Sequence, residues 1–217
     1  MKVIYGAIVQ RASGRFGGTV HSNWKGVDVV RRFAKPSNPN SAGQQTVRTA
    51  FKQLTALYGV LPSFVKAAWV SYATGKPIIA RNKLIALNVP ALNGQTDYSS
   101  FVPTPGDSST LPPVAFVPTG GNDQITTVIT PPSIPSGWTI ANCIACCISA
   151  AADPSSDPFD VEDLRIVNSD DASSPFTPTL SGLTAGDYYT WAFIQWNAPD
   201  GTTRYSASLA GGSVTVT

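Results

Sequence analysis

Apolar and polar residues follow two different periods along this chain. Between residues 41 and 89 the apolar residues recur every three or four positions, as in an amphipathic helix. Beyond residue 113, short apolar runs alternate with turn residues, which is typical of β-strands. Two more β-prone runs lie near the N-terminus. The pattern therefore predicts a small N-terminal hairpin, then helices, then a strand-rich half.

The N-terminal hairpin is expected from two runs, 19–24 and 27–33, that only Lys25 and Gly26 separate. In the second run odd positions share one face and even positions the other, and neither face is purely apolar. A hairpin of this size is marginally stable by itself. We therefore expect it to lie against another surface, in its own chain or in a partner. The apolar start, 1–11, is expected to be a strand or an arm that orders on assembly.

The first helix is expected to begin after Ser41, with Gln44 as the reciprocal partner in a capping box. It should end near Gly59. Its apolar stripe is expected to contain Val47, Phe51, Leu54 and Tyr58.

Two shorter helices should follow. Ser63 is expected to cap the second helix, Trp69 to pack in its core, and Gly75 to end it as a C′ glycine. The third helix is expected over 78–89 and ends at Pro90 because proline has no amide hydrogen to donate.

The second half predicts an antiparallel β-sandwich of eight short strands. A tyrosine follows a turn glycine in Leu183-x-x-Gly186-x-Tyr188, the local arrangement of the tyrosine corner in immunoglobulin-like and fibronectin-III-like domains. The strands are expected at 114–117, 124–130, 139–149, 164–167, 176–180, 188–196, 203–209 and 213–216. The fold class is therefore α+β, mainly β.

Charge is divided unequally between the two halves. Residues 1–95 contain 13 Lys or Arg and one acid, Asp28, for a net charge of +12. Residues 96–217 contain two Lys or Arg and 12 acids, for a net charge of −10. We therefore predict a basic docking domain at 1–95, a linker at 96–112 that is rich in proline, and an acidic sandwich domain at 113–217.

Composition favours a structural protein over a metabolic enzyme. Hydrophobic residues make up 42% of the chain and charged residues only 13%, about half the usual share of roughly 25%. No secretory signal and no membrane-spanning run is visible, and the three cysteines all lie within 143–147. We expect synthesis in a reducing host cytoplasm, no disulfide framework and no membrane association.

Several motifs together carry a family resemblance. They are SGRFGGTVHSNWKGVDVVRRF at 13–33, NPNSAGQQTVRTAF at 38–51, FVKAAWVSYA at 64–73 and the last strand GSVTV at 212–216. With them the chain resembles small proteins of phages, prophages and Bacteroidetes genomes, a domain-of-unknown-function family whose phage members look like virion or virion-associated proteins. The likeness spans most of the chain, with a variable middle. It implies a structural role and transfers no catalytic residue.

No catalytic or cofactor constellation is apparent. His21, the only histidine, has no carboxylate nearby in sequence to orient it as a general base. In a strand, Cys143 and Cys147 face one way and Cys146 the other, so buried thiols are expected rather than a zinc site. The acidic run 153–171 lacks EF-hand spacing, so we favour a solvated loop over calcium. Neither a paired-carboxylate glycosidase site nor a phosphate-binding loop is defined. We expect no enzyme activity and no cofactor.

The leading hypothesis is a bacteriophage structural protein, such as a capsid decoration or cement protein or a tail component, that docks through its basic half. Its partners would be an acidic coat lattice or neighbouring copies, with homo-oligomers in the particle. Nucleic acid is possible but not favoured, because no nucleic-acid-binding signature is visible. The predicted interface residues are Arg15, Phe16, Trp24, Lys25, Arg31, Arg32, Phe33, Arg48 and Lys52.

The alternative hypothesis is a module that binds a glycan or a host surface. Its sandwich would recognise the ligand through exposed loop aromatics such as Trp138 or Phe159, with the N-terminal half as its anchor.

Overall fold

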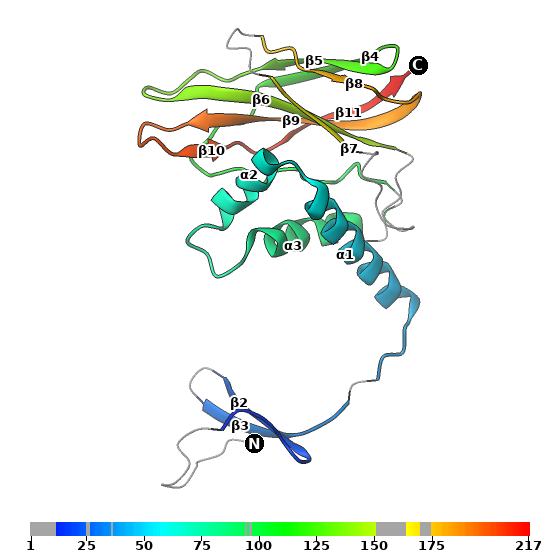
Figure 1. Ribbon diagram of the computed structural model, residues 1–217, viewed down its shortest axis with the longest axis vertical. Coiled ribbons are helices and arrows are strands. Elements are labelled where there is room, and N and C mark those ends of the chain that lie inside the picture. Colours follow the sequence, from blue (N-terminus) through cyan, green and yellow to red (C-terminus); the bar gives the residue numbers. More distant parts are fainter. Residues whose placement is uncertain are drawn as a thin grey trace. The chain divides into compact units, whose positions relative to one another are not determined.

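A computed structural model of the chain describes residues 12–24, 27–35, 37–93, 95, 97–150, 164–169 and 175–217. The chain divides into two compact units, Met1–Asn40 and Ser41–Thr217. Each unit is described by itself below, and Figure 1 shows the elements of both.

The first unit contains a three-stranded antiparallel sheet in the order β1-β2-β3. The strands are β1 (Gly14–Phe16), β2 (Thr19–Trp24) and β3 (Val27–Arg32). Trp24 pairs with Val27 across the turn, which confirms the predicted hairpin. Strand β1 was not predicted. It pairs with β2 through the tight turn at Gly17 and Gly18, and three residues are too few to show a strand period.

The second unit begins with three helices, as predicted. They are α1 (Ala42–Val60), α2 (Ser63–Ala73) and α3 (Ala80–Leu92). Helix α1 begins directly after Ser41, but the Ser41 side chain makes no capping hydrogen bond, so the predicted capping box is wrong. Gly75 has a φ of +74°, a conformation that glycine adopts without strain, as expected after the end of α2.

Three further details of the helices differ from the prediction. Ser63 is the first residue of α2 and not its cap, because Pro62 occupies the cap position and no side chain makes a capping hydrogen bond there. Pro90 lies inside the last turn of α3 instead of ending the helix. Its missing amide removes one helical bond, while Asn93 N still donates to Val89 O at 2.9 Å. The buried face of α1 is also rotated from the predicted stripe: Val47 is 42% exposed and Phe51 51% exposed. The buried residues of α1 are Ala50, Gln53, Leu54 and Leu57.

The remaining strands form two antiparallel sheets in the second unit. The larger sheet has the order β10-β9-β6-β7, with β11 also pairing with β9, and the smaller has the order β4-β5-β8. Their bounds are β4 (Ala115–Gly120), β5 (Gln124–Thr130), β6 (Thr139–Ser149), β7 (Leu164–Ser169), β8 (Thr179–Ser181), β9 (Gly186–Asn197), β10 (Thr203–Tyr205) and β11 (Leu209–Val216). Each predicted strand overlaps one of them, apart from a shift at 176–180, where Phe176 makes an isolated bridge and β8 follows.

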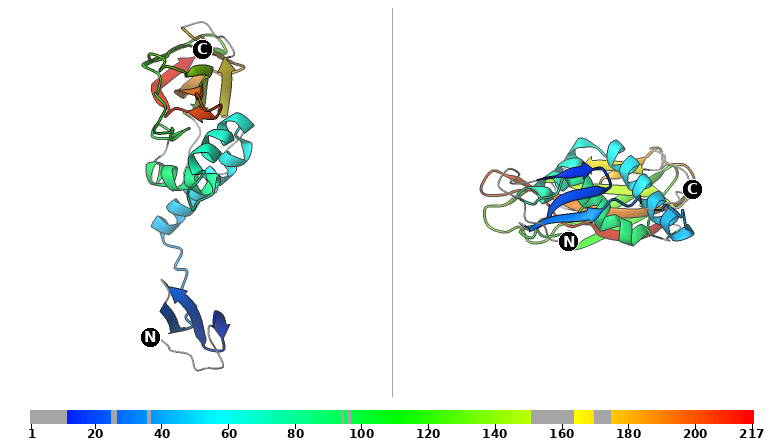
Figure 2. Two further views of the ribbon diagram at one scale, coloured as in Figure 1. Left: turned by 90° about the vertical axis from the view of Figure 1, so that its left-hand side faces the viewer. Right: turned by 90° about the horizontal axis from the view of Figure 1, so that it is seen from below.

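The larger sheet is buried on both faces, which gives the second unit three layers. Ile144, Cys146, Ile148, Trp191 and Phe193 pack with the helices in one core. The alternate residues of β6 and β9 pack against the smaller sheet in a second core. Figure 1 shows the helices on one side of the larger sheet and β4, β5 and β8 on the other, and Figure 2 gives the view along the strands.

The predicted tyrosine corner is present. The Tyr188 hydroxyl donates to the Thr184 carbonyl oxygen at 3.0 Å, where the chain enters β9. This contact, the two facing antiparallel sheets and the preceding helices confirm the α+β, mainly β class and the β-sandwich.

The division of the chain differs from the predicted one at two places. The helices share a core with the sandwich, so the boundary between the units falls after Asn40 and not at residue 95. The segment expected to be a linker at 96–112 is fastened to both layers. Tyr98 and Phe101 are buried, and Trp69 Nε1 donates to Pro103 O at 2.8 Å.

Further hydrogen bonds fasten the same segment. The Asn88 amide accepts from Val102 N at 2.7 Å and donates to Val102 O at 3.2 Å. On the sheet side, Thr104 Oγ1 donates to Ser206 O at 2.9 Å. The polar, proline-rich composition that predicted a linker therefore belongs to a segment that joins the helices to the sheet.

Candidate functional site

The sheet of the first unit has no core among its described residues. Every described residue of 12–40 is exposed or half-buried, whereas the second unit buries two large apolar clusters. Phe16 is 81% exposed and Phe33 is 38% exposed. A sheet that buries no side chain on either face is far from the usual arrangement, in which at least one face packs against another layer. These side chains are therefore available to a partner.

The strand register places basic and apolar side chains on one face of this sheet. Val20 pairs with Arg15 on one side and with Arg31 on the other, so the three form a row across the sheet. Along β3, Val27 and Val29 alternate onto the same face as Arg31. We call this the arginine–phenylalanine face, and its described members are Arg15, Val20, Ser22, Val27, Val29, Arg31 and Phe33.

A cation–π contact links the two residue types that give this face its name. The Arg15 guanidinium lies 3.9 Å from the centroid of the Phe33 ring. Phe33 is held in place because its backbone amide donates to Gly18 O at 2.8 Å. Arginine over an aromatic ring keeps its charge while covering apolar surface. The face can therefore offer both charge and apolar area to one partner.

The opposite face is more polar. Thr19 Oγ1 lies 3.2 Å from His21 Nε2, and Asn23 Nδ2 donates to Asp28 Oδ1 at 2.9 Å. Asp28 is the only acid in residues 1–40, and its carboxylate accepts a hydrogen bond from the Asn23 amide on this face.

The predicted interface residues fall into two separate groups. Arg15, Phe16, Arg31, Arg32 and Phe33 lie in the sheet of the first unit and are all exposed. Trp24 occupies the end of β2 opposite Val27, but its side chain, like Lys25, lies outside the described part of the structure. The structure therefore places five of the nine predicted residues in one sheet. Arg15, Arg31 and Phe33 lie on its arginine–phenylalanine face, and Phe16 and Arg32 lie on the opposite face.

Arg48 and Lys52 belong to the second unit. They lie exposed on α1 next to Val47 and Phe51, which are also exposed. Sequence reasoning assigned Val47 and Phe51 to the core, so it missed this second surface of mixed apolar and basic character. The signal was present: residues 47, 48, 51 and 52 lie on adjoining sides of a helix.

The cysteines are core residues, as predicted. Cys143 and Cys147 pack between the sheets and Cys146 packs on the helix side. Burial raises the pKa of the Cys143 thiol, and of the Cys147 thiol, to about 12, which keeps both protonated and unreactive at neutral pH. In the described ranges, no group of three or more His, Cys, Asp or Glu side chains is placed to hold a metal ion.

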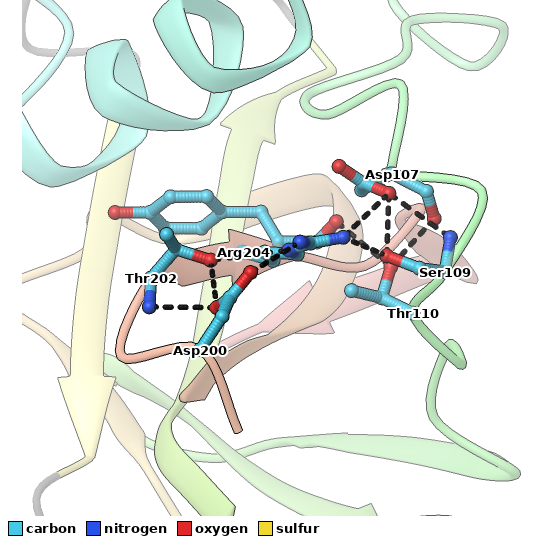
Figure 3. Close-up of polar contacts among 7 residues, drawn as sticks. Asp107, Ser109, Thr110, Asp200, Thr202 and Arg204 are labelled. Atoms are coloured by element: carbon cyan, nitrogen blue, oxygen red, sulfur yellow. Dashed lines mark hydrogen bonds and ion pairs between the residues drawn. The ribbon is translucent and has the colours of Figure 1, made fainter. Parts of the chain in front are cut away.

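A groove of about 810 Å³ lies between α2 and the β9–β10 hairpin of the second unit. Figure 3 shows the polar cluster at its sheet side. Arg204 Nη2 pairs with Asp200 Oδ2 at 2.8 Å, and Arg204 Nη1 donates to Ser109 Oγ at 2.8 Å. Hydrogen bonds from the side chain and backbone of Thr202, with a smaller contribution from Arg204, together lower the pKa of Asp200 to about 2. These contacts join the hairpin to the loop at 107–110.

Of the two aromatics predicted to bind a glycan, only Trp138 lies in the described structure. Trp138 is half-buried, with its ring 6.2 Å from that of Trp196 in an edge-to-face arrangement. Arg204 covers it further, at 5.8 Å from the ring centroid. Phe159 lies outside the described residues, as does most of the acidic run at 153–171.

Comparison with known proteins identifies no family. No family model matches the sequence, and no curated protein matches it. Among solved structures, the fibronectin(III)-like modules of CbhA from Clostridium thermocellum are similar at 15% sequence identity and a TM-score of 0.23. That match covers 47% of this chain and 94% of the other. The assignment of the sandwich rests on the sheet topology and the tyrosine corner described above.

Within the described residues, no single helix is long and apolar enough to span a membrane. Helices α1 and α2 pass the test of length and composition only as a pair, and they are bent by 115° at their junction.

Proposed function

We propose that this chain is a non-enzymatic structural component of a bacteriophage particle, a capsid decoration or cement protein or another head- or tail-associated protein. It docks through the sheet of its first unit and displays the three-layer second unit. The single observation that carries this proposal is that the described residues of the first sheet include no buried side chain, while Arg15, Arg31 and Phe33 on its arginine–phenylalanine face are exposed. The resemblance of the sequence motifs to virion-associated proteins supports the choice of particle.

The docking step follows from the energetics of a small sheet. An isolated sheet of three short strands with no buried face has little to offset the entropy lost on ordering. Covering its valines and phenylalanine with a partner removes apolar area from water, at about 25 cal/mol per Å². Assembly therefore stabilises the sheet, and the exposed arginines orient it on an acidic surface.

The chemistry of the face favours a protein partner over nucleic acid. Aromatic residues and arginine are enriched in the centre of protein interfaces, and lysine is depleted there. The described members of the face are arginine, valine, phenylalanine and one serine, with no lysine among them. Three valines add aliphatic area, which a phosphate backbone does not match.

The test is incorporation into particles. Density-gradient-purified particles from the source are analysed by mass spectrometry, and this chain is quantified against the most abundant coat protein. We expect a fixed ratio in the wild type and a loss of incorporation for the double variant Arg15→Glu, Arg31→Glu. The matched control, Arg81→Glu with Lys83→Glu on α3, should be incorporated normally. Absence of the wild-type chain from particles would refute the proposal.

A second candidate function, binding of a glycan, is favoured by the groove beside α2. Hydroxyl groups line it together with the charged Lys66, Asp107 and Arg204, a mixture suited to hydrogen bonding with sugars. The lining hydroxyls belong to Ser63, Ser71, Thr74, Thr202 and Thr203. Binding of the full chain on a glycan array, lost in Thr74→Val and Thr203→Val, would support this candidate. An array without signal would remove it.

A further inference from the structure

We infer that the partner of the arginine–phenylalanine face is the acidic sandwich of a second copy of this chain. The inference rests on the proposed function, because it names the partner of the same docking surface. The contact between copies is head-to-tail, and the partner is a second copy and not an unrelated acidic coat protein.

Charge complementarity is the first argument. Residues 1–40 contain seven Lys or Arg and one acid, and residues 41–95 add six Lys or Arg without any acid. Residues 96–217 contain two Lys or Arg and 12 acids. One of those two cations, Arg204, is already paired with Asp200 at 2.8 Å. The chain therefore carries its own complementary surface, and every copy supplies both partners at equal concentration.

Exposed acids lie together at one end of the sandwich. Asp123 and Asp187 are both exposed and lie at the end of the sandwich where β11 finishes. Asp123 N donates to Thr217 O at 3.2 Å, and the Asp187 carboxylate accepts from Thr215 Oγ1 at 2.5 Å. The Asp187 carboxylate is therefore held by a side chain of β11, and the Asp123 backbone is joined to the residue that follows the same strand. Two exposed acids at this end of the sandwich are complementary in charge to the row in which Arg15 and Arg31 flank Val20.

The third argument is the connection between the units. Residues 33–40 contain no helix or strand among those described. Eight residues span at most about 26 Å when extended, at about 3.3 Å per residue. A connection of this length without regular structure allows the sheet to bind a neighbouring molecule.

The contact joins two different surfaces, so it is heterologous. Such contacts produce closed rings when the rotation closes, and open chains when it does not. A repeating lattice of copies on a particle is one such arrangement. The contact also combines apolar area from the valines and Phe33 with partly exposed charge pairs, and added salt screens the latter.

The experiment uses three full-length proteins, with their size measured by light scattering after gel filtration at low salt. One is the wild type, the second is the sheet variant Arg15→Glu, Arg31→Glu, and the third is the sandwich variant Asp123→Lys, Asp187→Lys. We expect the wild type to associate as its concentration rises. For each variant alone, the affinity between copies should fall at least about tenfold, because like charges then face each other.

Mixing the two variants is the decisive step. Association should return in the mixture, because each variant retains one intact surface and the reversed charges attract each other. The control variant Arg81→Glu, Lys83→Glu should associate like the wild type. Circular dichroism of each variant shows whether weaker association comes from a lost contact or from unfolding. Recovery of association in the mixture would also show that the variants are folded.

Two results would overturn the inference: a wild type that stays monomeric at every concentration, or variants that do not recover on mixing. A monomeric wild type whose sheet variant still drops out of particles would leave the proposed function standing, with another particle protein as partner. A sheet variant that is incorporated normally would refute the proposed function itself. If the wild type bound duplex DNA and the sheet variant did not, the partner of the face would be nucleic acid and not a second copy.

Discussion

The sheet of the first unit and the larger sheet of the second unit have the same kind of strand pairing, but different layers cover their faces. In both, antiparallel strands pair in regular register across short turns. Strands β6 and β9 lie between two layers, and more than half of the residues in each are buried. Strands β2 and β3 have no covering layer among the described residues of their unit.

This difference separates the interactions that stabilise a sheet from those that only specify its strand pairing. Pairing and turn chemistry are enough to specify the β1-β2-β3 sheet. The free energy that keeps a sheet folded comes mainly from removing apolar side chains from water. The second unit obtains it from helices on one face and a second sheet on the other. The described residues of the first unit provide no such layer, so we propose that a partner supplies it at the exposed face.

The largest expected effect is on amide hydrogen exchange. In the free chain, amides of β6 and β9 should exchange at least about a thousandfold more slowly than those of β2 and β3, because local opening of an uncovered sheet requires little free energy. The measurement is exchange followed by mass spectrometry of peptides from each strand. Equal protection of β2 and β6 in a monomer would show that the first sheet is stable without a partner, and would remove the basis of the docking proposal.

The next effect is on the core between the helices and the larger sheet. Leu54 is fully buried, so Leu54→Ala should lower the free energy of unfolding by about 2–5 kcal/mol. Phe51, one turn away on α1, is the matched control because it is 51% exposed. Phe51→Ala should lower stability by less than about 1 kcal/mol. Urea denaturation followed by tryptophan fluorescence measures both. A loss of stability for Phe51→Ala as large as that for Leu54→Ala would mean that the sequence stripe is the buried face after all.

A smaller effect is expected where β4 meets β11. A Cβ at Gly120 would overlap the carbonyl oxygen of Thr215, so Gly120→Ala should lower stability by about 1–3 kcal/mol. The neighbouring Gly121 has no atom closer than 3.5 Å to its Cβ position, so Gly121→Ala should change stability by about 0.5 kcal/mol or less. Thermal unfolding of the two variants compares them directly. Equal stability would show that the two sheets do not approach this closely.

The smallest effect is local and depends on pH. The folded chain lowers the pKa of Asp200 from 3.8 to about 2, chiefly through the side-chain and backbone hydrogen bonds from Thr202. Because the folded value is below the unfolded one, this contribution is present above pH 4 and is lost as the pH falls from about 4 to about 2. An NMR titration should give a midpoint for Asp200 near the lower value.

The matched variants for this titration are neighbours in the chain. Thr202→Ala should raise the pKa of Asp200 toward its ordinary value, because it removes the hydroxyl that donates at 2.5 Å. Thr203→Ala should leave it unchanged. A wild-type midpoint near 4 would contradict the hydrogen-bonded geometry of this turn.

Part of the candidate site was predictable from the sequence, and part was not. Strand alternation alone placed Val29, Arg31 and Phe33 on one face of β3. Arg15 joined that face only because β1 pairs with β2, and a three-residue strand has no period to reveal it. Arg48 and Lys52 were grouped with the same surface because of their charge, although they belong to the second unit.

The sequence by itself determined the local structure of this protein. Turn residues and the two hydrophobic periods were sufficient for the hairpin, the three helices, most strands and the tyrosine corner at Tyr188, since each depends on residues close together in the chain. Tertiary structure decided which side of α1 is buried and where the unit boundary falls. Those outcomes depend on contacts such as Trp69 with Pro103 and Thr104 with Ser206, which join residues 34 and 102 positions apart. A local pattern carries no record of such distant partners, so only the packed layers revealed them.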